Sequence, residues 1–224
     1  IHAYPDIAEH YALMNCGASM GEGYGPMIVC KKGVSEEEAR NAVIAVPGLN
    51  TSAYLGLRLA WGDCEVAVVP FDEIIPRILD GTYTSGLIIH EGQLTYVDHD
   101  LDVLIDLGKW WTGRTPNWPM PLGGNVVRRD LGEDVMQDIT KYTKMSIEYA
   151  LKSPDEALEF AKAWGRGIDD DTNKEVVGMY VNNRTIDYKE DGRAAIRLFI
   201  KEGQHIGMIR NDFDTATMRF IGEP

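Results

Sequence analysis

Short apolar runs alternate with segments of helical spacing through the first half of the chain. A short apolar run bounded by turn residues predicts a buried strand, and such runs occur at residues 26–31, 42–46, 65–69, 85–89 and 103–107. Apolar positions at helical spacing predict helices at residues 51–61 and 71–79. Because strands that alternate with helices form parallel sheets covered by helices, this pattern predicts an α/β fold.

Helical patterns dominate the second half of the chain. A 3.6-residue period predicts an amphipathic helix over residues 133–151, with an apolar face formed by Val135, Ile139, Tyr142, Met145 and Tyr149. Capping signals predict further helices that start near Ser153 and Thr172, and a last one over residues 194–202 that ends at Gly203. Three prolines predict that residues 110–121 cross the surface without regular structure.

The two patterns predict two lobes. Residues 35–121 would form an inserted α/β lobe, lobe 2, and residues 1–34 together with 122–224 would form a discontinuous lobe 1. The chain would then cross between the lobes twice, as in a hinged molecule. A cleft between two lobes is a usual place for a small-molecule site.

Composition narrows the classes of function. The formal net charge is −13, with Lys and Arg scattered, which disfavours a nucleic-acid partner. No apolar run is long enough to cross a bilayer, so no membrane partner is expected. Cys16, Cys30 and Cys64 are odd in number and lack metal-site spacing, which favours reduced thiols and a cytoplasmic location. The acidic run around Asp98 is more typical of a solvated turn than of a metal site, so no metal is expected.

The first candidate for chemistry is His90, which directly follows the apolar run at residues 85–89. In open α/β sheets, ligands bind in the crevice outside the carboxyl ends of the strands. Position alone also fits an ordinary hydrogen-bonded histidine, so it does not decide the role.

The second candidate is the predicted helix start at Thr51 and Ser52. Free backbone N–H groups and two hydroxyls at a helix start suit an anion such as a carboxylate. Plain N-capping explains the same residues equally well.

Several motifs then occur in an order that resembles one enzyme family. They are AVPG at 45–48, TSAY at 51–54, GLIIHEGQLTY at 86–96, DLGKWW at 106–111, PMPLG at 119–123 and RRDL at 128–131. In that order they resemble the 1,4-dihydroxy-6-naphthoate synthases of the futalosine route to menaquinone. The resemblance runs nearly end to end, although the family's opening strand and helix are expected to be missing from lobe 1, before Ile1.

The resemblance implies a two-lobed fold similar to type II periplasmic binding proteins, with a hinged cleft between the lobes. It implies a lyase that converts cyclic dehypoxanthine futalosine, a small aromatic carboxylate, to 1,4-dihydroxy-6-naphthoate without a metal or organic cofactor. His90 falls on the proposed general base. The implied substrate-binding residues are Thr51, Ser52, Ala53, Ile1 and Leu122.

Two alternatives remain open from the sequence. One is a protein of the same fold that only binds an organic acid, and the other is a lyase similar to chorismate dehydratase. A homodimer is compatible with the sequence but no motif indicates one.

Overall fold

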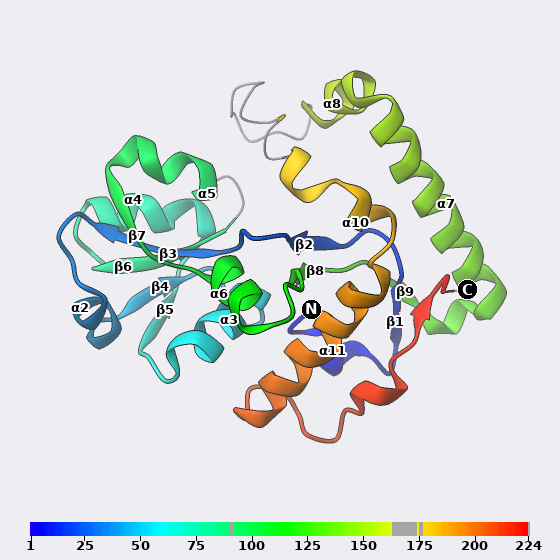
Figure 1. Cartoon of the computed structure of the whole chain (residues 1–224), viewed down its shortest axis with the longest axis horizontal. Coiled ribbons are helices and arrows are strands. Elements are labelled where there is room, and N and C mark those ends of the chain that lie inside the picture. The colour runs from blue at the N-terminus through cyan, green and yellow to red at the C-terminus, as the bar shows by residue number, and fades with distance from the viewer. Residues whose placement is uncertain (90–91, 163–173, 175–176, 224) are drawn as a thin grey trace.

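The computed structural model describes residues 1–89, 92–162, 174 and 177–223. Two groups of elements lie side by side, each built on its own sheet (Figure 1). Lobe 2 carries a five-stranded sheet and lobe 1 a three-stranded sheet. Between them run β2 (Ser19–Gly21) and β8 (Met120–Gly123), which pair with each other as an antiparallel ribbon. The helix start predicted at Thr172 lies outside the described residues, as do His90 and Glu91.

The sheet of lobe 2 has the strand order β5-β4-β6-β3-β7. Its strands are β3 (Met27–Lys31), β4 (Ile44–Val46), β5 (Val66–Val68), β6 (Ser85–Ile88) and β7 (Leu101–Asp106). The five predicted strands are therefore confirmed. Their expected direction is partly wrong, because β3 runs antiparallel to both β6 and β7. An apolar run indicates that a strand is buried, but it does not indicate the direction of the strand. The direction of β3 differs because the chain enters this sheet from the ribbon rather than through a helical crossover.

Two described helices of lobe 2 were predicted: α3 (Ser52–Trp61) and α4 (Ile74–Leu79), which follows the 3-10 turn η1 (Phe71–Glu73). Before them lies α2 (Glu36–Asn41), which a capping box from Ser35 begins. The short helix α5 (Gly92–Thr95) and the 3-10 turn η2 (Tyr96–His99) follow β6.

The prediction of an irregular segment at residues 110–121 is wrong in its first half. Residues Leu107–Arg114 form helix α6, because the Asp106 carboxylate accepts hydrogen bonds from the backbone N–H groups of Gly108 and Lys109. Trp111 is buried on this helix, and its indole N–H donates to the Pro119 carbonyl over 3.0 Å. The prolines lie beyond α6, so they end the helix rather than prevent it.

Lobe 1 is assembled from both ends of the chain. Its sheet has the order β10-β1-β9, formed by β1 (Tyr11–Met14), β9 (Val126–Arg128) and β10 (Phe220–Ile221). Among its described residues, the helices are α1 (Tyr4–Ile7), α7 (Glu133–Lys152), α8 (Pro154–Lys162), α10 (Asn183–Ile186) and α11 (Lys189–His205), and residues 177–180 are helical as well. The described 3-10 turns are η3 (Arg129–Leu131) and η4 (Thr215–Thr217).

The last long helix ends later than predicted. Gly203 lies inside α11 with no positive φ, and a Cβ there would come 2.7 Å from the Ile209 side chain. This glycine therefore serves close packing, whereas Gly207, with φ +74°, adopts the left-handed conformation just beyond the helix.

The two lobes share one hydrophobic core on the side of α11. Trp111 of α6 meets Phe199 of α11 edge to face, with ring centroids 5.3 Å apart. Arg114 and Glu202 join the same two helices by an ion pair of 2.9 Å.

The boundaries at residues 34/35 and 121/122 stay a prediction, and β3 already pairs within the sheet of lobe 2. No described helix is long and apolar enough to cross a membrane.

Candidate functional site

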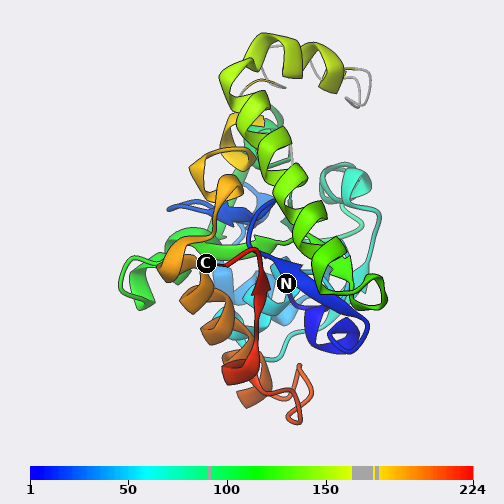
Figure 2. The same ribbon diagram turned by 90° about the vertical axis from the view of Figure 1, so that its right-hand side faces the viewer.

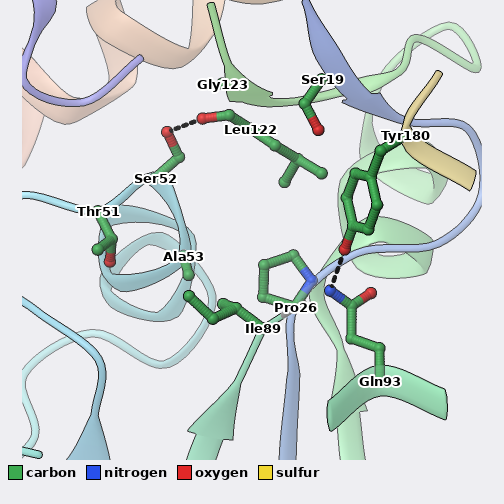
Figure 3. A pocket seen from close by; sticks show the side chains of 10 residues that line it. All are labelled: Ser19, Pro26, Thr51, Ser52, Ala53, Ile89, Gln93, Leu122, Gly123 and Tyr180. Carbon is green, nitrogen blue, oxygen red and sulfur yellow. Dashed lines mark hydrogen bonds between the residues drawn. The ribbon is translucent and has the colours of Figure 1, made fainter. Parts of the chain in front are cut away.

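A cavity of about 430 Å³ lies where the ribbon, lobe 2 and lobe 1 meet (Figure 3). This volume is in the range of small-molecule sites. The parallel strands β4 and β6 end at this cavity, so the predicted site at the carboxyl ends of the strands coincides with a real hollow. Its lining residues are Ser19, Pro26, Thr51, Ser52, Ala53, Ile89, Gln93, Leu122, Gly123 and Tyr180.

The start of α3 forms one wall of the cavity. Thr51 is the N-cap residue: its hydroxyl accepts from the Tyr54 backbone N–H over 3.1 Å and donates to the Gly48 carbonyl over 2.8 Å. The capping explanation therefore accounts for Thr51. Ser52 differs, because its hydroxyl donates to the Leu122 carbonyl across the cavity wall over 2.6 Å. This bond joins α3 to β8, so lobe 2 is fixed to the ribbon at the cavity.

The predicted substrate-binding residues come together, although their roles stay a prediction. Thr51, Ser52, Ala53 and Leu122 all line the cavity. Ile1 lies directly behind them, with its nitrogen 3.0 Å from Ser52 Oγ and 3.2 Å from the Leu122 carbonyl.

The predicted base, His90, lies outside the described residues. The residues nearest to it in sequence that the structure describes are Ile89 and Gly92. Ile89 lines the cavity, and so does Gln93, one residue beyond Gly92. The described residues on both sides of His90 in the sequence therefore reach the cavity wall.

Sequence reasoning missed several residues of the site, among them Gln93 and Tyr180. Gln93 lies within the 86–96 motif but was given no role, and its side-chain amide donates to the Tyr180 hydroxyl over 2.6 Å. Tyr180 is the last of the helical residues 177–180 of lobe 1 and has no sequence signal of its own. Ser19, Pro26 and Gly123 of the lining were missed as well, because only the fold brings the ribbon to the cavity.

The polar groups of the described cavity wall are neutral. None of the lining residues that the structure describes carries a charged side chain. Tyr24 stands behind Tyr180, and burial raises the pKa of its phenol to about 12, so it stays protonated at neutral pH. Among the described residues, no group of three or more His, Cys, Asp or Glu side chains gathers in a metal-binding arrangement. The wall as described suits an organic molecule held by apolar contact and a few neutral hydrogen bonds.

Comparisons with known proteins identify the family of this chain. A family model described as menaquinone biosynthesis matches residues 1–205. A 1,4-dihydroxy-6-naphthoate synthase of Thermus thermophilus is 34% identical over 206 residues, which span 92% of this chain and 75% of that protein. One of Streptomyces coelicolor is 32% identical over 211 residues, spanning 92% and 74%.

Solved structures give the same result for the fold. A crystal structure of an Archaeoglobus fulgidus protein is 40% identical, has a TM-score of 0.87 and covers 93% of this chain and 77% of its own. The alkanesulfonate-binding protein of Xanthomonas axonopodis is only 10% identical, but its TM-score of 0.64 over 96% of this chain and 75% of its own confirms the periplasmic-binding-protein-like α/β fold. By its sequence and its fold, the chain belongs to the menaquinone biosynthesis family, whose matched relatives are 1,4-dihydroxy-6-naphthoate synthases.

Proposed function

We propose that this chain is a lyase that converts cyclic dehypoxanthine futalosine to 1,4-dihydroxy-6-naphthoate in the cytoplasm. The observation that carries the proposal is the cavity at the ends of β4 and β6, since the family motifs at 45–54, 86–96 and 119–123 all reach its wall. The relatives named for this reaction span most of the chain, which supports the same assignment.

Each part of the cavity has a task in this proposal. The first backbone N–H groups of α3, at Ser52 and Ala53, receive the substrate carboxylate, since donors at a helix start favour an anion. The Ser52 hydroxyl, which donates to the Leu122 carbonyl, holds this helix start against β8. Leu122, Ala53 and Ile89 enclose the aromatic part by apolar contact. Enclosure removes water, which strengthens the remaining hydrogen bonds to the substrate.

His90 serves as the general base. The ordinary pKa of histidine is about 6.5, so a neutral imidazole is available near pH 7 to remove a proton from a substrate carbon. Ile89, the residue before it, lines the cavity, which supports a short path from the base to the bound substrate.

Incubation with cyclic dehypoxanthine futalosine, followed by mass analysis of the products, tests the proposal. We expect 1,4-dihydroxy-6-naphthoate to form, and turnover of chorismate instead would favour the chorismate dehydratase alternative. His90→Asn separates an enzyme from a binding protein, because we expect it to keep substrate affinity and lose about 10²- to 10⁴-fold in kcat. Near-normal turnover by His90→Asn would remove His90 from the mechanism.

A further inference from the structure

Gln93 is a buried polar side chain whose hydrogen bonds are incomplete. It lies on α5, is 4% exposed and lines the cavity. Its Nε2 donates to the Tyr180 hydroxyl over 2.6 Å, while its Oε1 accepts no hydrogen bond from any residue that the structure describes. Leaving a buried acceptor without a hydrogen bond lowers stability, so such an atom at a cavity wall calls for a partner.

Tyr180 meets Gln93 from the other lobe and is held in place from behind. Tyr24 packs against the Tyr180 ring edge to face, with centroids 6.2 Å apart. The Tyr24 hydroxyl hydrogen-bonds to the carbonyls of Met20 and Met179, which ties the segment before Tyr180 to the ribbon. The Gln93–Tyr180 pair is therefore a supported part of the wall rather than a chance surface contact.

The pair lies across the cavity from Ser52. Figure 3 shows the Ser52–Leu122 bond on one side and the Gln93–Tyr180 bond on the other, with the apolar side chains of Ile89 and Leu122 between them. The cavity therefore has two polar ends separated by an apolar middle, which matches an aromatic ligand with polar groups at both ends.

We infer that Gln93, supported by Tyr180, binds a hydroxyl group on the part of the substrate remote from its carboxylate. This inference rests on the proposed function, which supplies a ligand with a carboxylate at one end and oxygens at the other. A hydroxyl both donates and accepts, as a carboxamide does, so it satisfies Oε1 and takes a second hydrogen from Nε2.

The same chemistry sets the orientation of the substrate. A carboxylate is an acceptor only, so at the Gln93 end it would leave Oε1 unpaired and place two acceptors face to face. A site built to hydrogen-bond a hydroxyl discriminates strongly against a ligand that lacks it, because the buried polar group then stays unpaired. Gln93 thus acts in specificity, and His90 in the reaction itself.

Two ligands that share one skeleton test the inference directly. The first is 1,4-dihydroxy-6-naphthoate, and the second is 2-naphthoate, which has the same rings and carboxylate but no hydroxyls. Calorimetry gives Kd for each ligand with the unmodified chain and with Gln93→Leu. We expect the unmodified chain to prefer the dihydroxy ligand, and Gln93→Leu to lose roughly 10-fold of that preference while binding 2-naphthoate about as before. Tyr180→Phe should lose a smaller share of the preference.

Gln137→Leu is the matched control, because Gln137 is a half-buried residue of α7 that does not line the cavity, and its substitution should leave both Kd values unchanged. The inference would be overturned if Gln93→Leu kept the full preference for the dihydroxy ligand, or if it lost affinity for both ligands equally. Either result would leave the proposed function standing. If neither ligand binds the unmodified chain, both the inference and the proposed function fail.

Discussion

Helices α7 and α11 are both amphipathic, yet the apolar face of α11 is buried and that of α7 is exposed. On α11, the face formed by Ile196, Phe199 and Ile200 is completely buried. On α7, the predicted apolar face is exposed: Val135, Ile139, Tyr142, Met145 and Tyr149 are between 37% and 63% accessible. Figure 2 shows α7 along the outside of the molecule. A helical period therefore identifies an apolar face without identifying what covers it.

The difference follows from what stands opposite each helix. α11 lies where lobe 2 meets lobe 1, so α6 covers it with Trp111 and α3 approaches closely enough that a Cβ on Gly203 would come 3.2 Å from Leu55. α7 touches the small sheet of lobe 1 by its other side, where Met136 and Thr140 are buried. No described element buries the exposed stripe of α7 as α6 and α3 bury the apolar face of α11. The stripe is formed by Val135, Ile139, Tyr142, Met145 and Tyr149.

The largest loss of stability is expected from a substitution on the buried apolar face of α11. Phe199→Ala removes a ring that is fully buried against Trp111, so we expect a loss of about 3–5 kcal/mol in the free energy of unfolding. Urea denaturation monitored by tryptophan fluorescence measures it. Lys201→Ala, at an exposed position of the same helix, is the control and should cost little. A loss below 1 kcal/mol for Phe199→Ala would mean that the shared core does not join the lobes in solution.

A smaller effect is expected at the buried side of α7. Met136 is 5% exposed and packs in a cluster with Ala12, Cys16 and Ile221. Met136→Ala should lower the free energy of unfolding by about 2 kcal/mol, the low end for such truncations, because this cluster is small. The same denaturation experiment compares it with Phe199→Ala, and an equal loss in both variants would contradict the ranking.

The smallest change in stability is expected from substitutions on the exposed stripe of α7. Replacing Ile139 and Met145 together by Gln removes no described core contact and keeps helix propensity similar, so we expect a change within about 0.5 kcal/mol. Light scattering of the same samples reports whether self-association falls. A loss above 1 kcal/mol would show that the stripe is covered in solution and that α7 resembles α11 after all.

The sheet of lobe 2 and the long helices were predictable because they depend on local pattern, whereas the strands of the lobe 1 sheet and of the ribbon were not predicted. Apolar runs predict the strands of lobe 2, and helical periods predict the long helices. Both patterns involve only residues close together in the sequence. The antiparallel direction of β3 was not predictable, because direction depends on where the chain enters the sheet. Likewise, helix α6 depends on the Asp106 cap, and the three prolines that suggested an irregular segment lie after it.

The site was predictable only where a motif carried it. Thr51, Ser52, Ala53 and Leu122 lie in motifs and line the cavity as expected, while their roles in binding remain predictions. Tyr180 was missed because its partner, Gln93, is 87 residues away and no period links them. Contacts between lobes belong to the tertiary structure, and a single sequence does not reveal them.

The pairing of β1 with β10 has a consequence for the order in which the protein folds. Leu13 pairs with Phe220, so the sheet of lobe 1 is complete only after residue 220 has been synthesised. The sheet of lobe 2 uses only residues 27–106 and can form earlier, while the ribosome is still adding α7. Because long-range pairing is slow and leaves strand edges exposed, β1 and β9 are the strands most in need of protection by chaperones during synthesis.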